Sequence, residues 1–402
     1  MAGKMISELS DAITLQNTDL IPLARGASTL RIAGSAIATQ TNLLTLSANP
    51  FVAADTSTID LNLTNRTLSA SVIDSSITNS KLAFDGGSFA FRNKIINGSF
   101  DVWQRGTSLT SGSGARYLAD RWTNGSAGTT YTASRQSFTL GQTNVPGEPE
   151  YFHRSVVTSV AGASNNATLH QHIESVRTLA GKTATLSFYA KADAAKNIAV
   201  EFYRYFGTGG SPSTSVSFGV TTCALTTSWQ KFTVTVNIPS IAGKTIGTDR
   251  NDYLTVYFWL DAGSNNNSRT NSLGQQSGTF DFAEVQFEEG SVATPFEERP
   301  IGTELALCQR YYERGVGFYG YSITETGGGT GLSGGLTSTV TFRNIKRVNP
   351  VMTQTFTAGS GGYSTTIFSI WVPNIYGAQF NLTNSSNADV GGSISWAADA
   401  EF

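Results

Sequence analysis

The sequence predicts an all-β protein of several folding units. Charged residues make up only 14% of the chain, glycines number 41, and short runs of alternating apolar and polar residues recur between turn residues. Alternation with a period of two is typical of strands that bury one face, and such runs bounded by Gly, Pro, Asn and Ser favour many short strands joined by turns. At 402 residues the chain exceeds one ordinary domain, so about two or three units with connectors are expected.

The central region, 93–300, carries the clearest strand pattern, and its spacing predicts a β-sandwich of jelly-roll type. The expected strands are 94–96, 131–134, 153–157, 169–173, 183–191, 198–206, 216–220, 229–236, 253–260 and 279–287.

A helix and a second β-unit are expected after the sandwich. Thr303 is a good N-cap for a helix over 304–314, and Gly315 is placed to stop it. Residues 315–402 then read as a separate β-domain. Its expected strands are 340–345, 351–356, 367–372 and 379–382.

The first part of the chain lacks the material for a core of its own. Residues 1–83 contain a single aromatic side chain, Phe51, so this segment needs partners to bury apolar surface. Within it, the runs 19–24 and 28–32 flank Arg25 and predict a hairpin.

The connector over 41–95 has apolar residues at irregular spacings that fit neither a heptad repeat nor a pair of strands. Two interpretations stay open for it: a shaft in which three chains bury these residues together, or a flexible linker.

Several phrases resemble tail fibre proteins of tailed bacteriophages. ISELSDAITLQNTDLIPLARGASTLRIAG resembles their N-terminal attachment unit, and NKIINGSFDVWQRG, LAGKTATLSFYAKAD and FDFAEVQFEEGS resemble the carbohydrate-binding-module-like jelly rolls found within such fibres. EVQFEEGSVATPFEERPIGTELALCQRYYER resembles the link from that jelly roll to a small distal β-domain.

The resemblance implies a homotrimeric receptor-binding fibre located in the virion. Its expected parts are an attachment unit at 1–40 that docks on a tail or baseplate protein, a trimeric shaft or linker at 41–92, the jelly roll at 93–300, a connecting helix at 301–314 and the distal tip at 315–402. The expected partner of the tip and jelly roll is host surface polysaccharide.

Strand faces predict where a glycan would bind. In the run 253–260, four aliphatic or Phe side chains share one face and form the core, which leaves Tyr257 and Trp259 on the other face. The runs 183–191 and 198–206 divide in the same way. The expected glycan platform consists of the rings Tyr189, Tyr203, Tyr205, Tyr257 and Trp259 with the polar groups Glu201 and Lys191. Such rings can stack on a sugar face, although a loop, a neighbouring domain or another subunit could cover them instead.

The resemblance also implies a structural calcium ion bound by oxygen ligands between the first and last strands. Asp101 and Asp281 are the candidate ligands, while the pair Ala283-Glu284 stands where related modules often carry paired acidic residues, so the ligand set is incomplete. No other cofactor is expected.

Catalysis is not expected. His170 and His172 would share a strand face without a third metal ligand, and the neighbouring acidic residues at 288–289 and 297–298 cannot lie across a substrate bond. Two distant cysteines give neither a disulfide framework nor a metal spacing.

The net charge and the hydropathy of the chain exclude two classes of partner, nucleic acids and the membrane interior. A net charge of −2 gives no footprint for nucleic acid, and no apolar stretch is long enough for membrane insertion. Two alternatives to adhesion remain: a structural collar or baseplate fibre, and a polysaccharide depolymerase.

Overall fold

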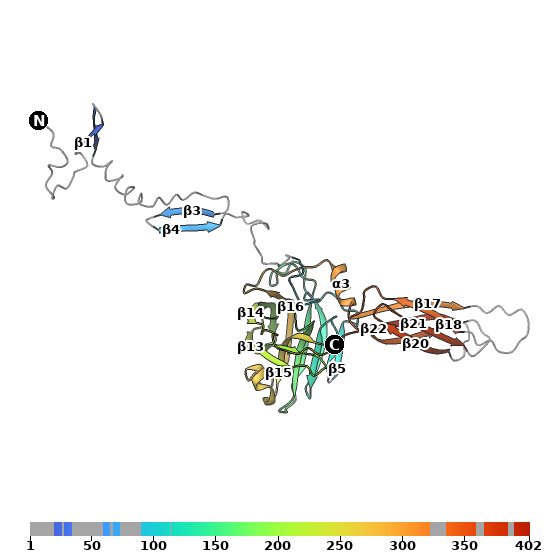
Figure 1. Ribbon diagram of the computed structural model, residues 1–402. Helices are drawn as coiled ribbons and strands as arrows, with labels where there is room; N and C mark the ends of the chain where they lie inside the picture. Colours follow the sequence, from blue (N-terminus) through green and yellow to red (C-terminus); the bar gives the residue numbers. More distant parts are fainter. Residues whose placement is uncertain are drawn as a thin grey trace, which may run out of the picture. The chain divides into compact units, whose positions relative to one another are not determined.

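The computed structural model describes residues 20–25, 28–33, 59–64, 67–72, 90–112, 114–321, 335–358, 366–384 and 390–402. The chain divides into two compact units, Met1–Gly86 and Gly87–Phe402. Figure 1 shows the strands of both units, coloured along the sequence.

Two antiparallel hairpins are described in the first unit. β1 (Leu20–Arg25) pairs with β2 (Ser28–Ala33), which confirms the predicted hairpin. β3 (Ile59–Thr64) pairs with β4 (Thr67–Val72), so the expectation of no strand pair in the connector was wrong. Leu61 and Leu63 alternate with polar residues over six positions, and so short an alternation can pair with the run that follows it in the sequence.

Most of the attachment unit and most of the shaft or linker lie outside the described residues, as do residues 322–334, 359–365 and 385–389 of the expected tip. Within the second unit, the predicted jelly-roll β-sandwich is confirmed. Sheet 1 has the strand order β13-β12-β15-β10-β7-β6, and sheet 2 has the order β14-β11-β16-β9-β8-β5. All of these strand pairs are antiparallel.

The strand bounds follow the predicted runs closely from β8 to β16, while β5, β6 and β7 were not predicted. The bounds are β5 (Ser108–Gly112), β6 (Arg116–Tyr117), β7 (Thr123–Ala127), β8 (Thr130–Ser137), β9 (Tyr151–Thr158), β10 (Asn166–Glu174), β11 (Thr183–Ala192), β12 (Lys196–Tyr205), β13 (Val216–Leu225), β14 (Gln230–Asn237), β15 (Tyr253–Ala262) and β16 (Gly278–Glu289).

The predicted strand at 94–96 is the exception. This segment is a bend that makes a backbone hydrogen bond from the Lys94 N–H to the Phe287 carbonyl at 2.7 Å, while the Ile96 N–H donates to the side chain of Gln171 at 2.8 Å. A few residues on, the Val285 N–H donates to the Gly98 carbonyl at 2.9 Å. Because a side-chain partner replaces the ladder hydrogen bond at Ile96, the local apolar run does not extend into a strand.

The core lies between the two sheets and is built from the faces that alternation predicted. Phe188 of β11 meets Phe258 of β15 edge-on, with ring centroids 4.9 Å apart, and Phe202 of β12 stacks on Phe287 of β16 at 5.3 Å. These side chains are fully buried, and aromatic pairs of this kind add to the stabilisation from buried area.

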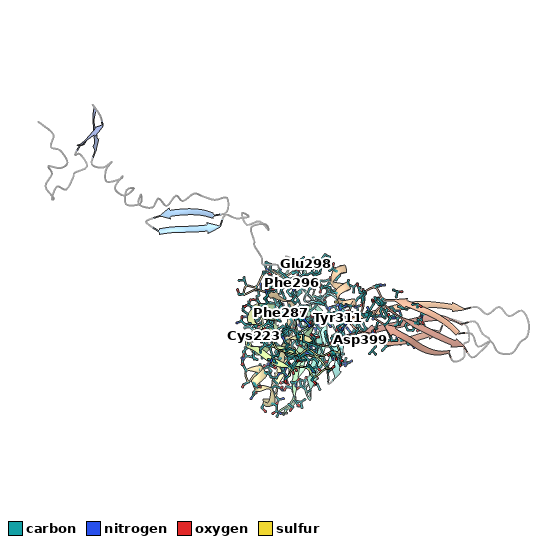
Figure 2. All side chains as sticks on the ribbon, in the orientation of Figure 1. Cys223, Phe287, Phe296, Glu298, Tyr311 and Asp399 are labelled. Atoms are coloured by element: carbon teal, nitrogen blue, oxygen red, sulfur yellow. The ribbon has the colours of Figure 1, made fainter. Side chains whose placement is uncertain are left out.

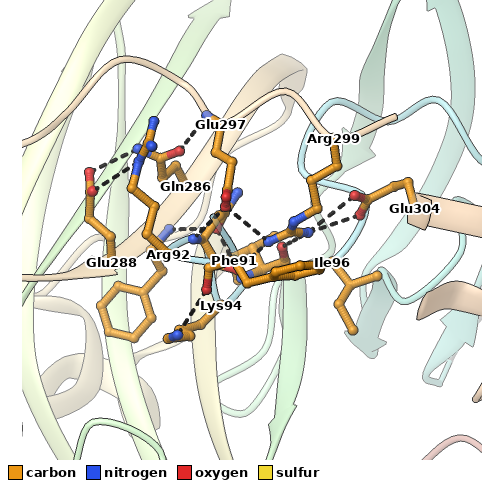
Figure 3. Close-up of polar contacts among 12 residues, drawn as sticks. Phe91, Arg92, Lys94, Ile96, Gln286, Glu288, Glu297, Arg299 and Glu304 are labelled. Carbon is orange, nitrogen blue, oxygen red and sulfur yellow. Dashed lines mark hydrogen bonds and ion pairs between the residues drawn. The ribbon is translucent and has the colours of Figure 1, made fainter. Parts of the chain in front are cut away.

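The segment after β16 folds back along the sandwich and is fixed by ion pairs (Figure 3). Arg299 pairs with Glu304 at 3.1 Å and with Glu297 at 3.4 Å, and it donates to the Asn93 carbonyl. Arg92 lies 3.6 Å from the Glu288 carboxylate. Residues 92 and 93, at the start of the sandwich, are therefore held both by Arg299 of this segment and by Glu288 at the end of β16.

The helix of the link is shorter and earlier than predicted. α3 spans Ile301–Gln309 with Pro300 at its N-cap, so the Thr303 cap and the helix over 304–314 were wrong. Tyr312 and the residues that follow instead form β17 (Tyr312–Tyr321), which pairs with β22 (Val390–Asp399). A long-range strand partner overrides the helical preference of the local sequence.

Two three-stranded sheets, drawn in orange to red in Figure 1, are built almost entirely from the residues predicted to form the distal β-domain. Their orders are β17-β22-β19 and β18-β21-β20. The remaining bounds are β18 (Gly335–Thr341), β19 (Val351–Ala358), β20 (Thr366–Asn374) and β21 (Gly377–Asn384). β18 begins and ends earlier than the run predicted at 340–345, because it pairs with β21 only from Gly335 to Thr341.

Candidate functional site

The predicted glycan platform does not form a single surface. Tyr203 and Tyr205 of β12 and Tyr257 of β15 lie on the outer face of sheet 1, whereas Tyr189 and Lys191 belong to β11 in sheet 2. The five-ring platform was therefore wrong. Alternation along a strand separates core from surface, but it does not say to which sheet of a sandwich each strand belongs.

On the outer face of sheet 1, a loop covers one end of the rings. Trp259 is 3% exposed and donates its indole N–H to Glu201 Oε2 at 2.8 Å. Arg269, in α2 (Asn267–Thr270), makes a bidentate ion pair with Glu201 at 2.7 and 2.9 Å. The polar groups of Glu201 and Trp259 thus have hydrogen-bond partners within the chain, as the alternative of a covering loop predicted. The other rings, Tyr203, Tyr205 and Tyr257, are half-buried.

The C-terminus covers the other end of this face. The Phe402 ring lies 5.2 Å from Tyr253 and 5.6 Å from His172. Burial lowers the pKa of His170 to about 3 and holds that of His172 well below its usual value. These histidines are neutral packing residues, and His153, whose pKa burial also lowers to about 3, lies on β9 in the other sheet.

Over sheet 2 the structure contains a hollow of about 930 Å³. Tyr189 lines it, and Figure 2 labels two further lining residues, Phe296 and Glu298. The wall of the hollow consists of Ser99, Asp101, Pro146, Gly147, Glu148, Pro149, Glu150, Tyr151, Ser187, Tyr189, Lys231, Glu284, Ala293, Pro295, Phe296, Glu298 and Ile301. A hollow of this size is in the range of small-ligand sites.

A β-bulge in β16 aims a carboxylate into this hollow. Ser187 pairs with Gln286 and Tyr189 with Ala283, so Glu284 and Val285 together face one residue of β11. Val285 continues into the core, while Glu284 takes a positive φ of 46° and turns outward. Positive φ is uncommon for a residue other than glycine, and bulges re-aim side chains near functional sites.

The buried carboxylates of the hollow hold their protons more tightly than usual. Burial raises the pKa of Glu284 to about 7, with the nearby Glu298 adding to the shift and Lys231 opposing it. Burial also raises the pKa of Asp101, and the charges of Glu150, Glu304 and Glu298 act in the same direction.

The wall can offer a sugar two kinds of contact. Tyr189, Tyr151 and Phe296 supply rings that can stack on the apolar face of a pyranose. The carboxylates supply hydrogen-bond acceptors for its hydroxyl groups. Of the predicted glycan residues, only Tyr189 lines this hollow.

Part of the remaining wall comes from segments with no strand pattern, which sequence reasoning could not place, while Tyr151, Ser187, Lys231 and Glu284 come from strands. Glu148 and Glu150 lie just before β9, and Phe296 and Glu298 lie in the exit segment after β16. The pair Ala283-Glu284 was the one visible signal, since it departs from the alternation of FDFAEVQF.

The two candidate calcium ligands have different surroundings. Asp281 accepts two hydrogen bonds from Arg154, at 2.7 and 2.8 Å, and lies 3.7 Å from Lys191 Nζ. Asp101 lines the hollow, and its side chain accepts a hydrogen bond from Ser99. Among the described residues, no group of three or more His, Cys, Asp or Glu side chains is arranged to hold a metal ion. The calcium site stays a prediction.

No helix among the described residues has the length and apolar character needed to cross a membrane. No protein-family model matches the sequence, and no curated protein matches it either.

Among solved structures, the chain is similar to carbohydrate-binding modules and to a phage protein. A CBM4 structure shares 20% identity and a TM-score of 0.26, covering 48% of this chain and 98% of that one. A family 11 carbohydrate-binding module from Clostridium thermocellum, in complex with a β-1,3-1,4-mixed-linked tetrasaccharide, shares 14% identity and a TM-score of 0.27, covering 46% and 100%. The enzymatically active domain of tailspike protein 4 of bacteriophage CBA120 shares 13% identity and a TM-score of 0.29, covering 50% of this chain and 22% of that one. None of these similarities bears on which ligand this chain binds.

Proposed function

We propose that this chain is a glycan-binding adhesion protein whose ligand occupies the hollow over sheet 2. The observation that carries the proposal is the wall itself, which combines the rings of Tyr189, Tyr151 and Phe296 with carboxylate acceptors in about 930 Å³. Sugar sites need this combination, because stacking contributes affinity and hydrogen bonds to hydroxyls contribute orientation.

In its finer form, the proposal is a virion tail fibre. The N-terminal residues 1–40 attach it to a tail or baseplate protein, three chains assemble, and the hollow engages polysaccharide on the host surface. The tail-fibre-like phrases of the sequence support this form. Three weak sites on one fibre bind cooperatively to a repeating polymer, since linked sites raise the effective concentration of one another.

The test of glycan binding compares two tyrosine variants of the full-length chain. Tyr189→Ala removes a ring of the hollow, and Tyr205→Ala removes one from the opposite sheet as a matched control. On a glycan array, we expect Tyr189→Ala to bind the wild-type ligand at least about tenfold more weakly, a loss of about 1.4 kcal/mol. Tyr205→Ala should bind like the wild type. Equal binding by both variants would remove the hollow from the proposal.

The fibre assignment has a separate test. Light scattering of the full-length chain should give a trimer, and the protein should compete with virions for adsorption to the host cell. A monomer, or a well-folded trimer that does not compete, counts against it.

A structural fibre without receptor binding is the second candidate. The half-buried rings Tyr203, Tyr205 and Tyr257 on sheet 1 favour it, because aromatic surface of this kind is typical of protein interfaces. In that case Tyr257→Ala would weaken assembly, and no glycan on the array would bind.

A further inference from the structure

The hollow over sheet 2 carries an unbalanced set of charges. Five of its lining side chains are carboxylates and one is an ammonium group, that of Lys231. The carboxylates are Asp101, Glu148, Glu150, Glu284 and Glu298. Like charges brought together in partly buried surroundings repel, so the empty hollow favours an entering group of positive charge over a neutral one and strongly disfavours an anion.

Glu284 is the part of this set that points to a ligand. Its side chain is buried, with 8% of the residue exposed, and it forms no hydrogen bond or ion pair among the described residues. Its Oε1 faces Gly147 across the hollow, 3.4 Å from the place a Cβ on that glycine would take. A buried carboxylate without a partner is costly, so such groups are normally paired.

The backbone around Glu284 holds the carboxylate in this place. The bulge gives the residue its positive φ, and the flanking Ala283 and Val285 are packed at 0% exposure. Strained backbone persists only where the surroundings enforce it, and it clusters at ligand sites. The backbone therefore directs the Glu284 side chain into the hollow.

We infer that the hollow selects a glycan that carries a free amino group, and that Glu284 is the residue that pairs with the ligand's ammonium. The inference rests on the proposed function and names its ligand class. Neutral sugars can use the same rings and acceptors but leave Glu284 without a counter-charge, and acidic sugars meet repulsion from the whole wall.

The charged and titratable groups that line the hollow around Glu284 determine whether its carboxyl group is protonated. They are Lys231 from β14, Tyr189 from β11, Glu298 from the exit segment, Asp101 from the loop after the first turn, and Glu148 and Glu150 from the loop before β9. Binding of an ammonium group favours the ionised form of Glu284, and the proton it held is released to solvent. The attraction between the ammonium group and the carboxylates of the hollow is screened by salt, so affinity for the amine should also fall as ionic strength rises.

The test uses the full-length protein and three oligosaccharide probes in isothermal titration at pH 7 and low salt. Chitosan tetramer and chitin tetramer share one backbone and linkage and differ in free versus acetylated amino groups, and tetragalacturonate supplies a carboxylate series. We expect the chitosan tetramer to bind at least about tenfold more tightly than the chitin tetramer, with no measurable binding of tetragalacturonate.

Two variants separate the role of Glu284 from general charge. Glu284→Gln should lose about tenfold in affinity for the chitosan tetramer, and clearly less for the chitin tetramer, so that the preference for the free amine shrinks. Glu289→Gln removes an exposed carboxylate of the same strand that pairs with Lys182 outside the hollow, and it should change neither.

Every outcome decides the inference. Chitin tetramer or tetragalacturonate binding as tightly as chitosan tetramer overturns it while the proposed glycan-binding function stands. Unchanged chitosan affinity in Glu284→Gln also overturns it. If none of the probes binds the wild type, the inference fails, and the glycan array then shows whether the proposed function fails with it.

Discussion

At the scale of single residues, Glu284 links the site to stability. Its pKa of about 7 lies above the ordinary value of 4.5, so the native state binds a proton more tightly than the unfolded state. Stability is therefore lost as pH rises from about 4.5 through 7. We expect Glu284→Gln to be more stable than the wild type at pH 8 by on the order of 2 kcal/mol, and about equal to it near pH 4.5. Urea melts of both proteins at the two pH values measure this difference.

Glu289→Gln is the control for that experiment. Its exposed ion pair with Lys182, at 3.1 Å, contributes little, so its stability should follow the wild type at both pH values. A stabilisation of Glu284→Gln that did not depend on pH would contradict an unpaired, titrating carboxylate.

The histidines give a second prediction at this scale. The chain has three, and burial lowers the pKa values of His153 and His170 to about 3 and that of His172 well below its usual range. All three should stay neutral in the native protein at pH 5. Proton NMR should therefore show three ring C–H signals that do not shift between pH 7.5 and 5, whereas an exposed imidazole would titrate near 6.5.

Their effect on stability has the opposite sign to that of Glu284. Unfolded histidines bind protons below about pH 6.5 and the native ones do not, so they cost stability as pH falls. Glu284 and Asp120, whose pKa burial raises to about 6, bind protons in the native state and offset this loss. A histidine signal that moved above pH 5 would show that its ring is open to water.

At the scale of elements, the turn at 93–100 depends on close backbone contact with β16. A Cβ on Gly98 would lie 2.1 Å from the Val285 carbonyl oxygen, which accepts a hydrogen bond from the Asn93 amide at 3.1 Å. Since neither backbone can yield cheaply, we expect Gly98→Ala to destabilise the protein by about 3 kcal/mol. Thermal melts and denaturant titrations measure this cost.

Gly302 in α3 is the matched control, because nothing lies within 4 Å of a Cβ added there. Gly302→Ala should be neutral or stabilise the protein by up to about 1 kcal/mol, since alanine favours a helix. Similar losses in both variants would show that Gly98 matters through its backbone freedom and not through the contact.

Sequence reasoning reached the strands and their faces but not how they meet. Alternation in the runs of β11, β12 and β15 identified Phe188, Phe202 and Phe258 as core correctly, because burial of one face is a local property of the pattern. Assignment of Tyr189 to one sheet and Tyr257 to the other depends on crossings between sheets, which no local pattern encodes. The bulge at Glu284 is likewise a product of pairing with β11.

The helix shows the same limit from the other direction. Glu313 and Arg314 are good helix formers with a glycine after them, yet they join β17 because Ala398 and Ala397 of β22, more than eighty residues later, supply strand partners. The part of the wall that Glu150 and Phe296 form cannot be predicted from local sequence patterns either, because it depends on where loops distant in sequence meet.

At the scale of the whole molecule, the last two residues join the distal β-domain to the sandwich. The side chains of Arg121 and Glu401 form a buried ion pair, and Arg121 also lies 3.5 Å from the centre of the Tyr311 ring. Arg347 covers the Phe402 ring at 3.9 Å. In Figure 1 the C-terminus lies against the sandwich, in agreement with the contact of Phe402 with Tyr253.

This junction predicts that the two β-domains unfold together. Glu401→Gln leaves the Arg121 charge buried without its partner, which should cost about 3 kcal/mol or more. Arg121→Met with Glu401→Gln removes both charges, so the double variant should be less destabilised than the sum of the single ones. Calorimetry of the full-length chain should show one transition for residues 87–402 in the wild type and a separate, earlier transition of the distal domain in Glu401→Gln. If the distal domain already melts alone in the wild type, the Arg121–Glu401 pair does not couple the two β-domains.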